Sequence, residues 1–556
     1  MAACDRCQRA DSLNPPDPLS IARLGFHKLV HNNSENGTWH GAWQMKLGMR
    51  WGTCLVGLSL TLLSWQERLG GAERALLLNA LNSITTQELQ KHVDVLADDS
   101  FEGREAGSRG GQAAAGYLRQ QLEKTGLKPV GEDGGYFQSF GNGCRNILAL
   151  QEGSDPELKN EIVIIGAHYD HVGYGNRGNS FGPFGYVHNG ADDNASGTSG
   201  VLEVIDAFRY LPTPPARTIL FAFWDGEEKG LLGSKHWVNH PTLPLDRVVF
   251  AFNLDMIGYL RNERLEVYGA RTSEGLRRLV SEQNRDQALA LDFDWEIKPN
   301  SDHYSFYERS IPFLMFHTGL HDHYHRPSDD THLINKEGMQ AVSHLLFRVM
   351  NEVANAEGKR PFRREATQEA LSGRSQLESP SPPAPPRLGV RWDDRVTDRI
   401  VVDHVEPDSP AARAGIQLKD ELLEVAGQRL ESRDHFRSCV LRAPARTVIR
   451  VRRESEPEPI DMVVSLAGKP VRVGLSWRED PAERGTVVIT GVVAGSPADR
   501  AGLKPLDRVY RLNAQPLASN EQLLQTLANE TSPVELEIER VGRISTITLQ
   551  VPPLLP

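Results

Sequence analysis

Five short segments rich in carboxylates and histidines constrain this chain more than any other feature. In chain order they read GAHYDH, GADDNASG, WDGEEKG, NLDMIG and YHRPSD. Three of them end the continuous apolar runs EIVIIG, TILFAF and VVFAF, which are typical of strands buried on both faces of an α/β sheet. Because α/β sheets build their binding sites at the carboxyl ends of such strands, we expect these segments to meet at one edge of a sheet.

The residue types in these segments are those that bind zinc at catalytic sites, where histidine nitrogens and carboxylate oxygens leave a position open for water. His168 ends the first apolar run, and Asp170 follows at a spacing that suits a carboxylate holding the second imidazole nitrogen. One of the adjacent acids Asp192 and Asp193 is expected to bridge two metal ions. Considered alone, an acid at this position is more often explained by the dipole of the helix that follows.

The remaining segments supply further ligands and a base. Glu227 and Glu228 follow a buried strand and a glycine turn, so one can bind a metal ion while the other takes a proton from metal-bound water. We favour Glu227 as this base. Asp255 follows the third apolar run. The last loop contains four histidines among which composition does not choose: His317, His321, His323 and His325. Five ligands and one base are the donor set of a dinuclear zinc hydrolase.

Taken together, the segments resemble the zinc metallopeptidase family that includes bacterial leucyl aminopeptidases, aminopeptidase Y, glutamate carboxypeptidase and glutaminyl cyclase. The resemblance spans roughly residues 85–355 and includes LADDSFEGREAGSRGG near its start and SDHYSFYERSIP near its end. It implies an α/β fold with a mixed central sheet flanked by helices. It also implies two Zn²⁺ ions held by His168, Asp193, Glu228, Asp255 and His325.

Within this ligand set the resemblance makes Asp193 the bridge between the two zinc ions. Glu228 and His325 then complete one site, and His168 and Asp255 complete the other.

The resemblance also assigns roles around the metal ions. It implies that Glu227 is the general base and that Tyr324 stabilises the oxyanion, although a tyrosine in a polar loop could equally be packing. The peptide bond between Asp193 and Asn194 is expected to be cis, as in relatives. We therefore expect an aminopeptidase acting on peptide substrates. A carboxypeptidase, a glutaminyl-cyclase-like enzyme of the same family and a non-catalytic scaffold remain as alternatives.

The carboxyl-terminal part of the chain repeats itself. DSPAARAGIQLKDELLEVAGQRL recurs 87 residues later as GSPADRAGLKPLDRVYRLNAQPL. These repeats resemble two PDZ domains, which bind peptide C-termini or other partners by adding a strand to a sheet edge. We expect the proline-rich segment before them to be an extended tether, so that the peptidase is complete without them.

The expected organisation has six parts. They are a non-native or disordered extension (1–48), a signal peptide or membrane anchor (49–72), the metallopeptidase domain (85–356), a proline-rich linker (357–386) and two PDZ domains (387–468 and 471–553). The apolar stretch GTCLVGLSLTLLSW after Arg50 suits export, to the periplasm or medium, and an uncleaved signal would tether the protein to a membrane.

Composition limits the partners. A formal charge of −11 argues against nucleic acid, because phosphate binding needs a basic surface. Of the five cysteines, only Cys144 and Cys439 lie beyond the expected signal, in different domains, so no disulfide framework is expected.

Overall fold

The computed structural model describes residues 74–287, 289–369 and 371–553. The predicted extension and signal or anchor, residues 1–72, lie outside the described residues. Among the described helices, none combines the length and the apolar character that crossing a membrane requires.

A nine-stranded mixed sheet forms the centre of the peptidase domain, as the sequence predicts. Eight strands follow the order β1-β3-β5-β4-β6-β9-β7-β8, and β2 pairs with β3. Neighbouring strands β5, β4, β6 and β9 run parallel, whereas β3 and β7 run antiparallel to their neighbours β5 and β9. The strands are β1 (Lys128–Pro129), β2 (Phe137–Phe140), β3 (Cys144–Gln151), β4 (Ile162–His168), β5 (Thr218–Trp224), β6 (Val248–Leu254), β7 (Arg264–Tyr268), β8 (Ala290–Asp294) and β9 (Phe313–His317).

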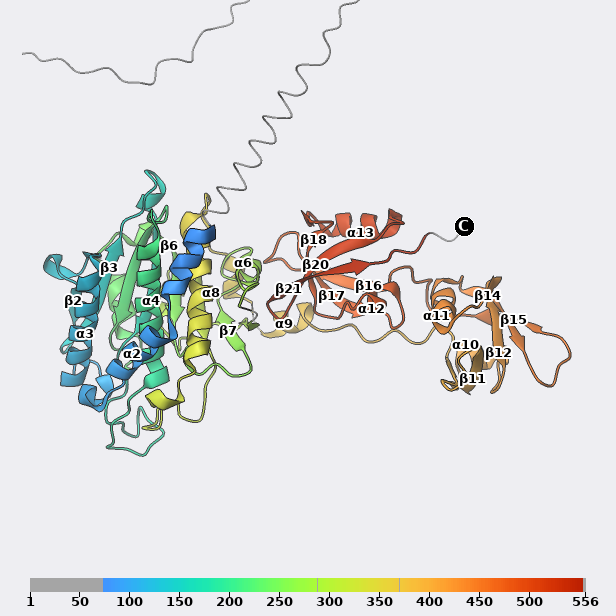
Figure 1. Cartoon of the computed structure of the whole chain (residues 1–556), viewed down its shortest axis with the longest axis horizontal. Coiled ribbons are helices and arrows are strands. Elements are labelled where there is room, and N and C mark those ends of the chain that lie inside the picture. The colour runs from blue at the N-terminus through green and yellow to red at the C-terminus, as the bar shows by residue number, and fades with distance from the viewer. Residues whose placement is uncertain (1–73, 288, 370, 554–556) are drawn as a thin grey trace, which may run out of the picture. The chain divides into compact units, whose positions relative to one another are not determined.

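Helices cover both faces of this sheet. Along β4, Val163 and Ile165 pack into one core, whereas Ile162 and Ile164 pack into the other, because successive side chains of a strand point to opposite faces. The first core is covered by α2 (Thr86–Leu96), α3 (Arg109–Thr125), α4 (Gly197–Tyr210), α6 (Leu276–Gln283) and α8 (Lys336–Asn355), of which α2, α4 and α8 lie side by side in Figure 1. The second core is covered by α5 (Leu232–Asn239) and α7 (His303–Tyr307).

Side-chain caps fix where the long helices begin. The hydroxyls of Thr85 and Ser108 accept backbone N–H groups of α2 and α3, and the amide oxygen of Asn335 does the same for α8. Short helical turns connect these elements: η1 (Asp99–Arg104), η2 (Glu132–Gly134), η3 (Leu158–Asn160), η4 (Ala191–Ser196), η5 (Leu245–Arg247), η6 (Thr331–Leu333) and η7 (Arg364–Thr367). The peptide bond between Asp193 and Asn194, within η4, is cis as expected.

The two sequence repeats form sheets of the same topology. The first has the order β10-β11-β12-β14-β15 with β13 beside β12, and the second has β16-β17-β18-β20-β21 with β19 beside β18. The first comprises β10 (Val390–Trp392), β11 (Ile400–Val405), α10 (Pro410–Ala414), β12 (Glu421–Val425), β13 (Gln428–Arg429), α11 (Arg433–Arg442), β14 (Arg446–Arg452) and β15 (Ile460–Ser465). The second comprises β16 (Leu475–Glu479), β17 (Val487–Val492), α12 (Pro497–Arg500), β18 (Arg508–Leu512), β19 (Gln515–Pro516), α13 (Asn520–Asn529), β20 (Val534–Arg540) and β21 (Arg543–Leu549).

The segment between the peptidase and the repeats is more ordered than an extended tether. It contains η7 and the helix α9 (Leu371–Leu377). After this segment, Asp480 of the second repeat is buried next to Arg508 of the same repeat. Its Oδ1 lies 2.9 Å from Nη1 of Arg271, which belongs to the peptidase domain. The backbone N–H of Leu291 in β8 also donates to Val541. An ion pair and a backbone hydrogen bond thus join segments that are distant in the sequence, and the proline-rich composition gives no sign of them.

Candidate metal centre

The carboxyl ends of neighbouring parallel strands bring the predicted residues to one edge of the sheet. His168 is the last residue of β4 and lies in register with the last residue of β5. Glu227 comes three residues after β5, and Asp255 comes directly after β6. His325 lies on the loop that follows β9, and Asp193 lies in η4. Segments far apart in the sequence therefore supply one site.

His168 forms a first cluster with two carboxylates. Its Nε2 lies 3.2 Å from Oδ1 of Asp255 and 3.5 Å from Oδ1 of Asp193. All three side chains are buried. Although burial lowers it, the pKa of His168 is held well above its ordinary value by the carboxylates of Asp255 and Glu227.

His325 forms a second cluster on the other side of Asp193. Its Nε2 lies 3.1 Å from Oδ2 of Asp193 and 3.1 Å from Oε2 of Glu228. Burial lowers the pKa of His325, but these two carboxylates raise it to about 10. Burial acts to raise the pKa of Glu228, yet hydrogen bonds from His171 and His325 hold it well below its usual range.

The spacing of these donor atoms fits zinc. In a tetrahedral site with zinc–ligand bonds of about 2.0–2.1 Å, neighbouring ligand atoms lie about 3.3 Å apart. Among the five predicted ligands, the four distances between imidazole and carboxylate atoms given above lie between 3.1 and 3.5 Å. One oxygen of Asp193 faces His168 and the other faces His325, as a bridging carboxylate requires. The five residues predicted as ligands are thus brought together with the spacing of a metal site.

Glu227 lies beside the first cluster. A carboxylate oxygen of Glu227 and ligand atoms of His168 and Asp255 all lie within 4.8 Å of one another. Burial raises the pKa of Glu227. The nearby His168 lowers this pKa, whereas the carboxylates of Glu228 and Asp255 raise it further. Its backbone N–H donates to Oδ1 of Asp170, 3.1 Å away.

The carboxylate of Asp170 does not hold the second imidazole nitrogen of His168, in contrast to what the sequence suggested. Nδ1 of His168 lies 3.1 Å from the backbone oxygen of Asp170 but 3.8 Å from its carboxylate, which is beyond hydrogen-bond distance. The carboxylate instead accepts the backbone N–H groups of Glu227 and Glu228. Asp170 therefore orients Glu227 and Glu228 through their backbone N–H groups, and its own carbonyl oxygen holds the imidazole of His168.

Tyr324 lines the cleft next to the metal centre. Its ring stacks on that of His325 with 3.9 Å between centroids. Burial, together with the carboxylates of Asp193 and Glu228, raises the pKa of its hydroxyl far above the ordinary value. The hydroxyl therefore stays protonated and can donate a hydrogen bond.

Two residues close to the ligands were missed by the sequence analysis. Nδ1 of His171 lies 2.9 Å from Oε1 of Glu228, so this histidine belongs to the second cluster. The carboxylate of Asp329 accepts the backbone N–H groups of Asp192 and Asp193, each at 3.0 Å. Both had a sign in the sequence, because His171 ends the GAHYDH segment and Asp329 ends the YHRPSD segment. Roles were assigned to other residues of these segments instead.

Arg104 is a third residue that was missed. Its side chain is fully buried and donates hydrogen bonds to the backbone oxygens of Leu96, Tyr169, Asn189 and Gly190. Tyr169 follows the ligand His168, and Gly190 precedes η4. Arg104 thus ties two ligand-bearing loops together through their backbones.

Asp192, the neighbour of the proposed bridge, points away from the metal centre. Its Oδ2 lies 3.0 Å from Nε2 of His321, and its Oδ1 accepts the backbone N–H of Gly258 at 2.6 Å. The carboxylate therefore fixes the loop that leads to His325, and this also explains why His321 is not among the clustered histidines.

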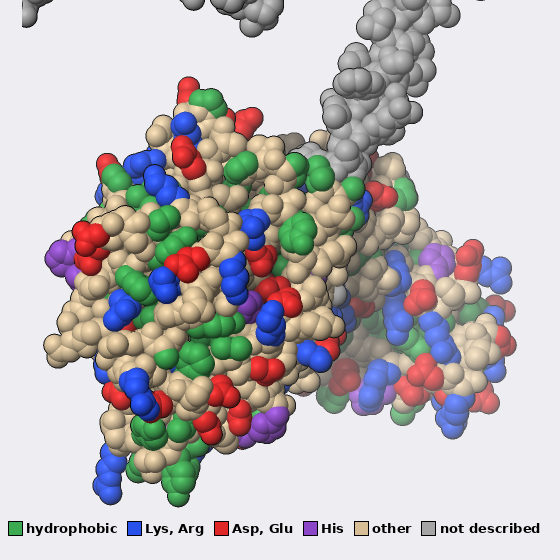
Figure 2. Space-filling model, turned by 60° about the vertical axis from the view of Figure 1, so that its left-hand side comes forward, with side chains coloured by type: hydrophobic (Ala, Val, Ile, Leu, Met, Phe, Trp, Pro, Cys, Tyr) green, Lys and Arg blue, Asp and Glu red, His purple; other side chains and the backbone are tan. Residues whose placement is uncertain are grey.

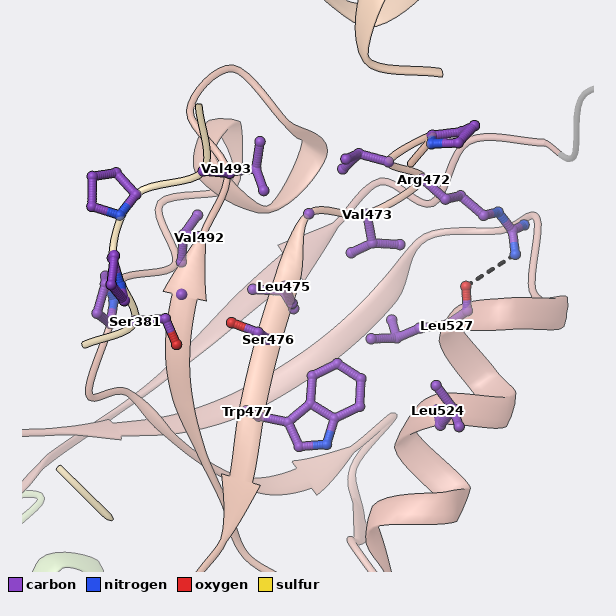
Figure 3. Close-up of a pocket in the computed structure, with 18 of the residues that line it drawn as sticks. Ser381, Arg472, Val473, Leu475, Ser476, Trp477, Val492, Val493, Leu524 and Leu527 are labelled. Carbon is purple, nitrogen blue, oxygen red and sulfur yellow. Dashed lines mark hydrogen bonds between the residues drawn. The ribbon is translucent and has the colours of Figure 1, made fainter. Parts of the chain in front are cut away.

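The second repeat contains a separate groove of about 840 Å³ between β16 and α13. Among the strands that the structure describes, β16 pairs with β17 alone, so its other edge has no strand partner there. Figure 3 shows Leu475 and Trp477 of β16 lying toward Leu524 and Leu527 of α13. Arg472 closes one end by donating to the backbone oxygen of Leu527 at 3.0 Å (Figure 3). An extended apolar peptide could add to this edge.

A mixed α/β sheet whose strand ends hold two carboxylate–imidazole clusters has the donor atoms to hold metal ions at one edge. Comparison with known proteins finds family models that match parts of the chain. Residues 146–350 match the model of peptidase family M28, and residues 401–453 and 488–540 match the PDZ domain. The chain thus carries a peptidase family M28 domain followed by two PDZ domains.

Two relatives found by sequence agree with this assignment. Aminopeptidase YwaD of Bacillus subtilis is 34% identical over 36% of this chain and 42% of its own length. Leucine aminopeptidase 1 of Grosmannia clavigera is 31% identical over 33% of this chain and 43% of its own length. The chain therefore matches less than half the length of these relatives. Among solved structures, the LapA aminopeptidase of Legionella pneumophila is 23% identical, covers 51% of this chain and 74% of its own, and has a TM-score of 0.44.

Proposed function

We propose that this protein is a dinuclear zinc aminopeptidase that removes residues from the amino termini of peptides. The observation that carries the proposal is the placement of Asp193, whose two oxygens face His168 and His325 in separate clusters. The names of the relatives, aminopeptidase and leucine aminopeptidase, support the direction of cleavage.

Each residue of the centre has a role in this reaction. Bound zinc would supply a Lewis acid and lower the pKa of a bound water to about 7. Glu227 accepts the proton of the attacking water and later delivers it to the leaving amine. The hydroxyl of Tyr324 donates to the oxygen on which negative charge develops. Asp170 orients Glu227 through the backbone.

The charge of the cleft favours an amino terminus over a carboxyl terminus. The cleft beside the centre has a volume of about 510 Å³. Beyond the metal ligands and Glu227, its lining contains the acids Glu266, Asp294 and Glu296, and the ammonium of Lys298 lies 2.7 Å from Glu296. A free α-amine is attracted by this surplus of carboxylates, whereas the terminal carboxylate that a carboxypeptidase binds would be repelled.

The test is a comparison of blocked and free termini on the purified full-length protein. We expect leucinamide and Leu-Gly-Gly to be cleaved, their N-acetyl forms to resist cleavage, and chelation of zinc to abolish turnover. Cleavage of N-acetyl peptides from the carboxyl end would favour the carboxypeptidase alternative. Cyclisation of amino-terminal glutamine without hydrolysis would favour the cyclase, and the absence of both activities would favour a scaffold.

Two accompanying proposals concern the rest of the chain. We propose that the groove of the second PDZ domain binds apolar peptide C-termini through the free edge of β16, which a fluorescence titration with C-terminal and amidated peptides would test. We also propose that the protein is exported, as the apolar stretch after Arg50 suggests. Fractionation of expressing cells would test this, and full retention in the cytoplasm would contradict it.

A further inference from the structure

The loop between β4 and η4 carries an exposed aromatic surface near the metal centre. We call it the aromatic rim and define it as Tyr174 (48% exposed), Phe181 (63%), Phe184 (46%) and Tyr186 (63%). Hydrophobic side chains gather at the lower end of the peptidase domain in Figure 2. Single exposed apolar side chains need no explanation, but four aromatic residues within one loop indicate a contact surface.

The rim is held in place by the backbone of a metal-ligand candidate. The N–H of Phe181 and the hydroxyl of Ser180 both donate to the backbone oxygen of His325, at 3.1 and 3.0 Å. Arg326, the next residue, donates from Nη1 to the backbone oxygen of Phe181 at 2.9 Å. The position of Phe181 is therefore fixed relative to the metal centre.

Phe181 also packs against the two aromatic residues that border the cleft. Its ring centroid lies 6.1 Å from that of Tyr324 and 6.4 Å from that of His325. Tyr324 and His325 line the cleft, whereas Phe181 is not part of that lining. Phe181 thus stands outside the cleft, against residues at its border, with most of its own surface exposed.

The positions of the cleft and the rim indicate which part of a bound peptide each would contact. From the metal centre the cleft extends to Glu266 and Tyr268 of β7 and to Asp294 of β8, where it can hold one terminal residue. The chain that follows the scissile bond cannot occupy the same space, and the rim borders the centre at His325.

We propose that the aromatic rim, with Phe181 as its main contact, binds the peptide residues that follow the scissile bond and favours an apolar or aromatic residue directly after it. This inference rests on the proposed peptidase function and deepens it by naming the substrate class. The physical basis is burial of exposed aromatic surface, with stacking added when the substrate residue is aromatic.

The experiment measures a ratio of two substrates rather than an absolute rate. For the full-length zinc-loaded protein, kcat/KM is determined for Leu-Phe-Gly-Gly and Leu-Gly-Gly-Gly. The wild-type protein is expected to prefer the first peptide by about tenfold, the size of effect that one aromatic contact gives. Phe181→Ala should reduce this ratio toward one, mainly through KM, and Phe181→Trp should restore it.

Tyr210→Ala is the matched control, because Tyr210 is also 63% exposed but ends α4 outside the rim. It should keep the wild-type ratio. Zinc content of each variant shows whether the centre is intact. If zinc-loaded Phe181→Ala cleaves both peptides with the wild-type ratio, the proposal that the rim binds the residues after the scissile bond is refuted, while the proposed peptidase function stands. If the wild-type protein cleaves no peptide, the proposed function itself fails.

Discussion

The neighbouring acids Asp192 and Asp193 provide a sharp test of the site, because the structure gives them opposite roles. Replacing Asp193 by asparagine removes a charge that faces both His168 and His325. We expect Asp193→Asn to lose zinc from both sites. Replacing Asp192 by asparagine should leave two zinc ions bound but destabilise the fold.

The cost of Asp192→Asn follows from its hydrogen bonds. Nδ1 of His321 accepts the backbone N–H of His323 at 3.2 Å, so Nε2 carries the proton that it donates to Oδ2 of Asp192 at 3.0 Å. An asparagine that keeps its oxygen toward Gly258 would turn an NH₂ group toward this N–H. Loss of a charge-assisted hydrogen bond costs about 1.5–3 kcal/mol, and a buried unpaired donor about 1–3 kcal/mol. The free energy of unfolding should therefore fall by about 2.5–6 kcal/mol.

The assays are zinc content after dialysis and denaturant unfolding of the chelated protein. Both variants are isosteric, so a difference between them cannot come from lost volume. Retained zinc in Asp193→Asn together with lost zinc in Asp192→Asn would show that the wrong acid was assigned as the bridge. Wild-type stability of Asp192→Asn would refute the role of the pair formed with His321.

Three further predictions follow from other parts of the molecule. Glu227→Gln should keep both zinc ions but lose at least about 10²-fold in turnover; loss of zinc, measured by metal analysis, would make Glu227 a ligand instead. Burial raises the pKa of Glu203 to about 8, above its unfolded value of 4.5, so its contribution to stability is complete below pH 4.5 and is lost as the pH rises through 8. Glu203→Gln should therefore be more stable than wild type at pH 9, and an unchanged difference in unfolding free energy between pH 5 and 9 would contradict this. Asp480→Asn removes the carboxylate that the buried guanidinium groups of Arg508 and Arg271 share, while Arg508 keeps Glu378 at 2.8 Å, so the loss of this charge-assisted contact should cost about 1.5–3 kcal/mol in denaturant unfolding. The control Asp461→Asn, exposed beside Arg450, should lose much less stability, and equal losses would contradict the buried pair.

Much of the fold was predictable because burial leaves a strong pattern in the sequence. The apolar runs that became β4, β5 and β6 are buried throughout or nearly so, and a strand of this kind requires covering helices on both faces. The 87-residue repeat likewise reappears as two sheets with the same strand order. The contact between Arg271 and Asp480 could not be predicted, because it joins segments about 200 residues apart and leaves no local pattern in the sequence.

By itself, the sequence determined which residues stand at the carboxyl ends of the buried strands, and therefore that His168, Glu227 and Asp255 share one edge of the sheet. The tertiary structure decided what the loop residues do. It turned His321 toward Asp192 and His325 toward Asp193, and it made the carboxylate of Asp170 an acceptor for backbone N–H groups. The physical reason is that a strand has a fixed side-chain period and a fixed direction, whereas loop side chains are oriented by hydrogen bonds to distant segments.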